Sequence, residues 1–202
     1  MFTILLKLTG VLPLALSGVF ALPSGYEGGN DLATRGLPPP DNIVYVTDVN
    51  TFCLMMPRFP YMKIGDSEQP GHTKTYCSVN GRYDRNGQGL LNPMFFSNIE
   101  YKYGYGQKGG RYVQLTGCIR PETLSRLNPT DQGGQYDSSG NDGKGMPPGS
   151  QCLGYNHYVE LVEPAQKRIC IRCCDDYDDC PTNKDTQGCP AVIQGNYFDC
   201  AY

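Results

Sequence analysis

The stretch RICIRCCDDYDDCP, Arg168 to Pro181, contains four of the chain's ten cysteines within eleven residues. Its first half alternates in the manner of a β-strand, whose successive side chains point to opposite faces. Cys173 and Cys174 are adjacent, so they should bond to two different neighbouring segments. The stretch therefore predicts a strand that is tied to its surroundings on both faces.

The ten cysteines are even in number and all follow the N-terminal region. In an exported chain such a set predicts disulfides, because thiols meet an oxidising environment on the way out. We expect five bridges, whose pairing the spacing leaves open, among Cys53, Cys77, Cys118, Cys152, Cys170, Cys173, Cys174, Cys180, Cys189 and Cys200.

Zinc is the main alternative use of these cysteines. Cys170-x-x-Cys173, with the later Cys180 and Cys189, loosely resembles a zinc ribbon. The chain lacks a second C-x-x-C and contains only two histidines. A thioredoxin-like redox motif would begin a helix, whereas this C-x-x-C falls within a β-type run. We therefore expect no metal and no cofactor.

The N-terminus has the pattern of a secretory signal. Lys7 precedes an apolar run from Val11 to Ala21, which ends in small residues suited to cleavage after Ala21. The alternative is an N-terminal membrane anchor, but spanning a bilayer takes about twenty apolar residues. No later segment is apolar enough to span a membrane. The sequence thus predicts a signal peptide at 1–21 and a secreted protein, extracellular or in the cell wall.

The remaining chain divides into an arm and one domain. Residues 22–41 have few large apolar side chains and three consecutive prolines, which predicts a flexible Pro/Gly-rich arm. The length and cysteine content of residues 42–202 predict a single cysteine-rich β domain. Without Lys7 the chain carries 16 basic and 20 acidic residues, a net charge of −4. This balance argues against nucleic acid as a partner.

Short β-type runs separated by turn signals predict an all-β fold, a disulfide-stabilised antiparallel sandwich or barrel with long loops. Asn80-Gly81 and the GQKGG of 106–110 are the predicted hairpin turns. One short helix is expected at 120–128, and 128–151 is a long polar loop. Cys118 and Cys152 flank that loop, and a bridge between them would tether its ends. The strands are expected within 42–57, 74–85, 98–118 and 156–174.

The chain carries no nucleophile, zinc-protease or phosphate-loop motif. His157 shares a strand face with Val159 and Leu161 and is interpreted as structural, and His72 has no evident partner. Calcium is the alternative use of two acidic segments, DSSGNDG (137–143) and DDYDD (175–179), but the first lacks the turn glycine and the closing glutamate of a calcium loop. We interpret the first segment as part of the polar loop and the second as a solvated acidic turn. Acidic pairs that could serve a hydrolase are Asp66 with Glu68, Asp131 with Asp137, and Glu160 with Glu163.

Tyr101, Tyr103 and Tyr105 alternate along one predicted strand and so share a face. Such a stripe can serve as an aromatic platform for sugar rings. The alternative is that these tyrosines cover a core, with their hydroxyls reaching a partner or water.

The order of several short motifs resembles a family of fungal secreted cysteine-rich proteins, some of which are labelled macrophage-activating glycoprotein. The motifs are FCLMMP (52–57), IGDSE (64–68), TYC (75–77), YVQLTGCI (112–119), DQGGQYD (131–137), YVELVEP (158–164) and CIRCC (170–174), followed by GCPAVIQGNYFDC (188–200). The resemblance implies an extracellular location, a β-rich fold and no established reaction. This chain lacks an N-linked acceptor, because Asn128-Pro129-Thr130 contains the forbidden proline.

Three hypotheses follow for function. The first is a secreted, non-enzymatic fungal protein that acts at the cell surface or as an effector-like factor on a host protein. The second is a carbohydrate-binding module for cell-wall glycans, with the three tyrosines as its platform. The third is a small secreted hydrolase that uses paired carboxylates. The oligomeric state is left open.

Overall fold

The computed structural model describes residues 39–200, apart from the side chains of Asn141 and Asp185. The expected signal peptide (1–21) and most of the expected arm (22–41) lie outside the described residues. None of the described helices is long and apolar enough to cross a membrane.

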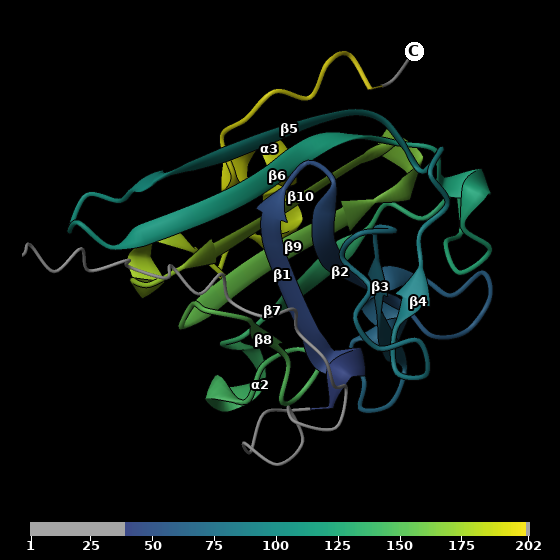
Figure 1. Cartoon of the computed structure of the whole chain (residues 1–202), viewed down its shortest axis with the longest axis horizontal. Helices are drawn as coiled ribbons and strands as arrows, with labels where there is room; N and C mark the ends of the chain where they lie inside the picture. Colours follow the sequence, from purple (N-terminus) through teal and green to yellow (C-terminus); the bar gives the residue numbers. More distant parts are fainter. Residues whose placement is uncertain (1–38, 201–202) are drawn as a thin grey trace, which may run out of the picture.

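Two five-stranded sheets pack face to face, which confirms the all-β prediction and selects a sandwich over a closed barrel (Figure 1). Pairing is antiparallel except between β1 and β8 and between β3 and β4. Sheet one has the order β4 (Gly89–Leu90), β3 (Thr73–Cys77), β2 (Thr51–Pro57), β1 (Ile43–Asp48), β8 (Gln151–Cys152). Sheet two has the order β5 (Phe96–Tyr105), β6 (Arg111–Ile119), β10 (Arg168–Cys174), β9 (His157–Glu163), β7 (Gly134–Asp137).

Helical segments are short and lie in the connections. The α-helical turns are α1 (Ile64–Ser67), α2 (Gly140–Gly143) and α3 (Cys189–Val192). The 3-10 turns are η2 (Pro40–Asn42), η3 (Pro121–Thr123), η4 (Pro164–Gln166), η5 (Tyr177–Asp179) and η6 (Asp185–Gln187).

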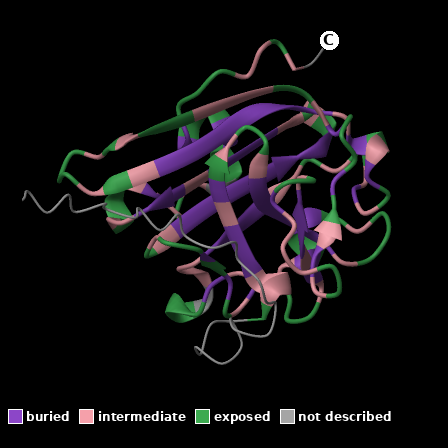
Figure 2. Cartoon of the chain, viewed as in Figure 1, coloured by how far each residue is buried: buried purple, intermediate pink, exposed green. Residues whose placement is uncertain are grey.

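The main core lies between the sheets. Leu54 and Met56 of sheet one are fully buried in the same cluster as Leu115 and Ile171 of sheet two. Most of β6, β9 and β10 is buried, whereas β5 is largely exposed or half-buried (Figure 2). Burial of this apolar surface, at about 25 cal/mol per Å², is the main force that holds the sheets together.

A second, smaller core covers the outer face of sheet two. Val159 and Leu161 of β9 point away from the sandwich and pack in one cluster with Val192 and Ile193 of the C-terminal segment. The alternation of β9 and β10 explains both cores, since each strand sends every second side chain to each side. Both strands are therefore apolar on both faces.

Five disulfides join the described segments, and no cysteine is free. The pairs are Cys53–Cys77, Cys118–Cys200, Cys152–Cys173, Cys170–Cys189 and Cys174–Cys180. Cys173 bonds inward to sheet one and Cys174 outward to the acidic turn, which confirms that the adjacent cysteines hold two different neighbours. The proposed tether of the 128–151 loop by a Cys118–Cys152 bridge is wrong, because each of these cysteines bonds elsewhere.

The hairpin expected at Asn80-Gly81 does not form. After β3 the chain makes a local turn, in which the Gly81 amide donates to the Ser78 carbonyl (3.1 Å), and it returns as β4, parallel to β3. Gly81 is packed against the β2 backbone: a Cβ there would lie 2.4 Å from the Phe52 carbonyl oxygen. The glycine serves this close approach rather than a hairpin. The hairpin predicted around 106–110 does form, between β5 and β6.

The helix expected at 120–128 shrinks to the single turn η3. The Leu124 amide donates to the Pro121 carbonyl, and the Leu127 amide donates to the Leu124 carbonyl (3.1 and 3.0 Å). These three-residue turns bring Leu124 and Leu127 onto the core, where they are 7% and 1% exposed. Burial of both leucines therefore overrides the helical pattern of this short segment.

Removing a bridge should cost stability in the order of the loop that it closes. The Cys152–Cys173 bridge spans a separation of 21 residues, so the Cys152→Ala/Cys173→Ala double variant should lose about 3 kcal/mol of the free energy of unfolding. The Cys174→Ala/Cys180→Ala variant, with a separation of 6, should lose about 2 kcal/mol. Urea unfolding of the oxidised proteins measures both, and equal stability of the parent and the first variant would contradict the bracing role.

Candidate functional site

The tyrosine stripe, defined as Tyr101, Tyr103 and Tyr105, lies on β5 and follows the inward-facing side of sheet two. Tyr101 is half-buried and packs against the main core. Tyr103 and Tyr105 are 74% and 71% exposed. The β5–β6 hairpin extends beyond β1 of the opposite sheet (Figure 1), which agrees with the exposure of these two rings among the described residues. The three tyrosines therefore share one face, as predicted. Tyr101 lies at the edge of the core, whereas Tyr103 and Tyr105 lie on the surface.

The rings of the stripe are arranged closely enough to act together. The centroids of the Tyr101 and Tyr103 rings are 6.4 Å apart, and their planes are inclined by 33°. The register of the hairpin places Tyr103 opposite Val113 and Tyr105 opposite Arg111. A two-residue step along a strand is about 6.8 Å, so the backbone itself sets the ring spacing.

Arg111 is fixed beside the stripe by an acidic partner. Its Nε and Nη2 donate to the two carboxylate oxygens of Asp175 at 2.7 and 3.2 Å. The Asp175 amide in turn donates to the Arg111 carbonyl (2.9 Å). The guanidinium hydrogen bond lowers the pKa of the Asp175 carboxyl below its ordinary value. The pair therefore stays ionised at neutral pH in one orientation, as a bidentate contact requires.

An aromatic ring from a distant part of the chain completes this end of the site. The Arg111 guanidinium lies over the ring of Tyr155, 5.3 Å from its centroid. Tyr155 also lines a shallow pocket of about 290 Å³ between β1 and the segment after β8. The hairpin, β8 and the end of β10 thus converge on one surface.

An apolar pocket lies at the other end of β5. It has a volume of about 340 Å³ and is lined by Val49, Asn50, Phe52, Ser78, Val79, Asn80, Leu91, Asn92, Pro93, Phe95, Phe96 and Ile99. Ile99 shares the inward face of β5 with the tyrosines, so the stripe leads into this pocket. Three asparagines and a serine supply hydrogen-bonding groups to its otherwise apolar lining.

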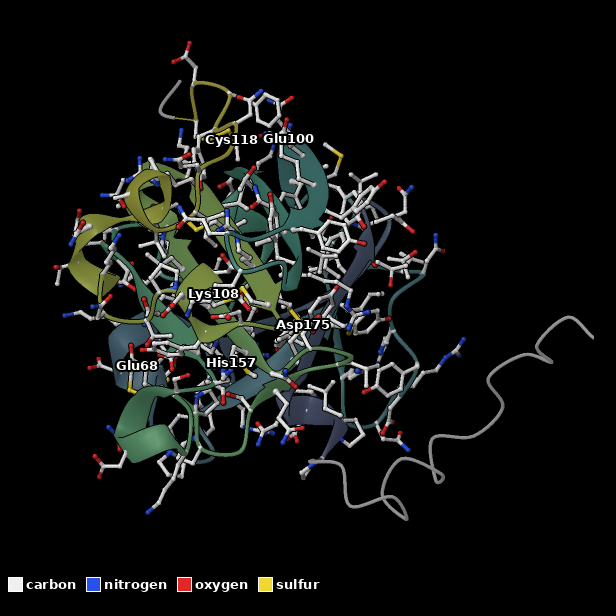
Figure 3. All side chains as sticks on the ribbon, turned by 90° about the vertical axis from the view of Figure 1, so that its left-hand side faces the viewer. Glu68, Glu100, Lys108, Cys118, His157 and Asp175 are labelled. Carbon is white, nitrogen blue, oxygen red and sulfur yellow. A yellow bond between two sulfur atoms is a disulfide. The ribbon has the colours of Figure 1, made fainter. Side chains whose placement is uncertain are left out.

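The acidic turn DDYDD holds the tip of the hairpin. Lys108 of the hairpin loop pairs with Asp178 and lies 3.8 Å from Asp176. Figure 3 views the molecule from this end, where Lys108 and Asp175 lie near the centre. Among the described residues there is no cluster of three or more side chains suited to a metal ion.

The two histidines are placed against aromatic rings. His157 packs edge-on against Tyr177, with 5.6 Å between ring centroids, and His72 packs in the same way against Phe59. Val159 and Leu161 continue the His157 face into the outer core, in keeping with a structural role.

The acidic pairs proposed for a hydrolase are largely engaged in the fold. Asp131 accepts from the Ile64 amide (2.8 Å), and Asp137 accepts from the amides of Ser139 (2.7 Å) and Gly140. Asp66 is exposed on α1, and its partner Glu68 is half-buried beyond the end of that helix.

Glu160 and Glu163 point to opposite sides of sheet two and are not a pair. Glu163 binds Arg168 and accepts from the Cys189 amide (3.3 Å). Glu160 lies between the sheets with no exposed surface, and its Oε2 accepts from the Met55 amide at 2.9 Å. Burial raises the pKa of Glu160 well above its ordinary value, and the Met55 hydrogen bond offsets this only in part.

Arg111 and Tyr155 are not among the site residues that the sequence predicts, and Asp175 is predicted only as part of the acidic turn DDYDD and not as a partner of Arg111. The hairpin pattern does contain a signal for Arg111, since it stands opposite Tyr105 across the GQKGG loop. Tyr155 carries no such signal, because only the packing of the two sheets brings it to the hairpin.

Comparison of the chain with protein-family models, with curated proteins and with solved structures finds no match.

Glu160 should make the protein less stable as pH rises. Its folded-state pKa is raised, so its contribution is complete below the unfolded pKa of about 4.3 and is lost as pH rises towards the folded value. Each pKa unit by which the folded value exceeds the unfolded value lowers the free energy of unfolding by about 1.4 kcal/mol at high pH. Glu160→Gln should therefore be more stable than the parent at pH 8 but not at pH 4, as measured by urea unfolding.

The matched control is Glu122→Gln, which alters an exposed glutamate in η3. Its unfolding free energy should follow that of the parent at every pH. A Glu160→Gln variant that keeps the full pH dependence of the parent would show that another group is responsible.

Proposed function

We propose that the protein is a secreted, non-enzymatic binding protein of a fungus, and that the tyrosine stripe holds extracellular carbohydrate chains. The single observation that carries this proposal is the exposure of Tyr103 and Tyr105, 74% and 71%, on a disulfide-braced sandwich. Two large exposed rings on one strand face form a contiguous patch, and such patches mark interaction sites. The flat face of a tyrosine matches the apolar C–H face of a sugar ring.

Polar groups at both ends of the stripe suit the hydroxyls of such a ligand. The Arg111–Asp175 pair presents fixed donors and acceptors next to Tyr105. At the other end, Asn50, Asn80 and Asn92 line the apolar pocket. Since hydrogen bonds to oriented groups give specificity and stacking gives area, this division is typical of sites for neutral polar ligands.

The shape of the site favours a polymer over a single sugar. The stripe is an open surface along a strand, without walls that would enclose a small molecule. A chain of sugars can extend past both ends of such a surface and contact several rings at once. Cell-wall glycans, which are polymers outside the cell, fit this requirement.

A protein partner is the second candidate, as an effector-like role would require. Val79 and Met94, near the apolar pocket, are 63% and 59% exposed, and Leu90 is 45% exposed. A patch of aliphatic side chains with a polar rim resembles the centre of a protein interface more than a sugar site.

Replacing one ring should remove most of the glycan binding. In pull-down assays with insoluble chitin and β-glucan, Tyr103→Ala should weaken binding by about tenfold, as expected for one stacked ring. Tyr103→Phe keeps the ring and should retain most of the affinity. Tyr61→Ala removes a tyrosine that is 68% exposed outside the stripe and should bind as the parent does.

The outcomes separate the two candidates. Equal binding by the parent and Tyr103→Ala, or no binding to any glycan on an array, would refute the carbohydrate proposal. Capture of a host protein that is lost in Val79→Asp and kept in Tyr103→Ala would favour the protein partner instead.

A further inference from the structure

The long open edge of sheet two is the feature that the proposed function leaves unused. Among the described strands, β5 has ten residues and pairs with β6 alone, while β4 and β8, which end sheet one, have two each. β7, at the other end of sheet two, has four. A long edge strand offers a row of unpaired backbone groups to another strand. We propose that a second copy of this chain pairs with β5, strand to strand and antiparallel, about a two-fold axis at Tyr101.

The backbone of β5 is suitably oriented for such pairing. The Gly106 amide donates to the Gly110 carbonyl (2.8 Å), and the Gly109 amide closes the turn onto Gly106. From this pair the ladder to β6 alternates, so every second residue of β5 directs its amide and carbonyl to the open edge. By this alternation the backbone amides and carbonyls of Tyr101, Tyr103 and Tyr105 point to the open edge, while those of Lys102 and Gly104 bond to β6.

The charges of β5 select one register. Glu100 and Lys102 flank Tyr101 and point to the outer face of the sheet. With the axis at Tyr101, Glu100 of each copy stands directly opposite Lys102 of the other. Moving the axis to Ile99 or Tyr103 places each charge opposite an uncharged residue. Within one chain the Lys102 Nζ lies 3.0 Å from the Glu100 carboxylate, so both charges are already on the same face.

The same register matches the side chains of the inner face. Tyr101 stands beside Tyr101 of the second copy, and Tyr103 stands opposite Ile99 of the second copy. Aromatic side chains opposite each other or opposite branched ones are favourable cross-strand pairs. This pairing is two-fold symmetric, and two-fold dimers, in which the same patch of both copies meets itself, are the commonest closed oligomers. The dimer would join two tyrosine stripes into one surface, but its formation does not depend on glycan binding.

The hydrogen bonds and the disulfide of the described C-terminal segment leave the backbone of β5 free to pair. Gln194 accepts at its carbonyl from the Gln114 side chain (2.9 Å), and the Asn196 amide donates to the Glu100 carboxylate (3.1 Å). Cys200 is bonded to Cys118 of β6. These contacts are with the outer face of sheet two, and none uses the backbone of β5.

Charge reversal tests the register. Sedimentation velocity of the purified full chain should show a dimer that dissociates on dilution. Lys102→Glu places Glu100 opposite a glutamate twice per dimer and should weaken dimerisation by about tenfold or more. The Glu100→Lys/Lys102→Glu double variant exchanges both charges and should restore it. Mixing Lys102→Glu with the single variant Glu100→Lys should produce a heterodimer, because each then supplies the charges that the other lacks.

Hydrogen exchange gives a second readout that locates the interface. The amides of Tyr101 and Tyr103 should exchange more slowly as the protein concentration rises, while the amide of Lys102, already paired with β6, should not change. A protein that stays monomeric when concentrated would overturn the proposal. So would a dimer that is insensitive to Lys102→Glu, or protection that appears on another surface or only when a different protein is bound.

Discussion

The fold depends on β10, a strand that is covalently attached on both of its faces. Because adjacent residues of a strand point in opposite directions, Cys173 reaches through the core to Cys152 of sheet one, while Cys174 reaches outward to Cys180. Cys170, on the same side as Cys174, holds α3. One central strand thus links both sheets and the outer C-terminal segment, and the two hydrophobic cores lie on either side of it.

This bracing explains how the protein can present large exposed rings. A hairpin that projects from a sheet would lose binding energy if it had to be ordered by its ligand. Here the tip is held by the Arg111–Asp175 pair and by Lys108 against the acidic turn, which the Cys174–Cys180 bridge fixes in place. The disulfides therefore support the site indirectly, by holding the partners of the hairpin.

Part of the candidate site could be predicted from sequence because it rests on the period of a single strand. Tyr101, Tyr103 and Tyr105 share a face for that reason alone. Their burial could not be predicted, since it depends on where the opposite sheet ends: Tyr101 lies under it and Tyr103 does not. The candidate acid pair of Glu160 and Glu163 is different, because an odd spacing within one strand already places two side chains on opposite faces. The structure shows that separation and gives the two carboxylates different partners.

The sequence by itself determined the class of the fold, the presence of two strands within 156–174, the hairpin at 106–110 and the opposite directions of Cys173 and Cys174. These features depend on local alternation and turn chemistry, which neighbours in sequence control. Only the tertiary structure decided the disulfide partners, the parallel return of β4 after Gly81 and the loss of the helix at 120–128. Those outcomes depend on contacts between segments far apart in the chain, where burial of Leu124 and Leu127 or the close approach of Gly81 to β2 outweighs local preference.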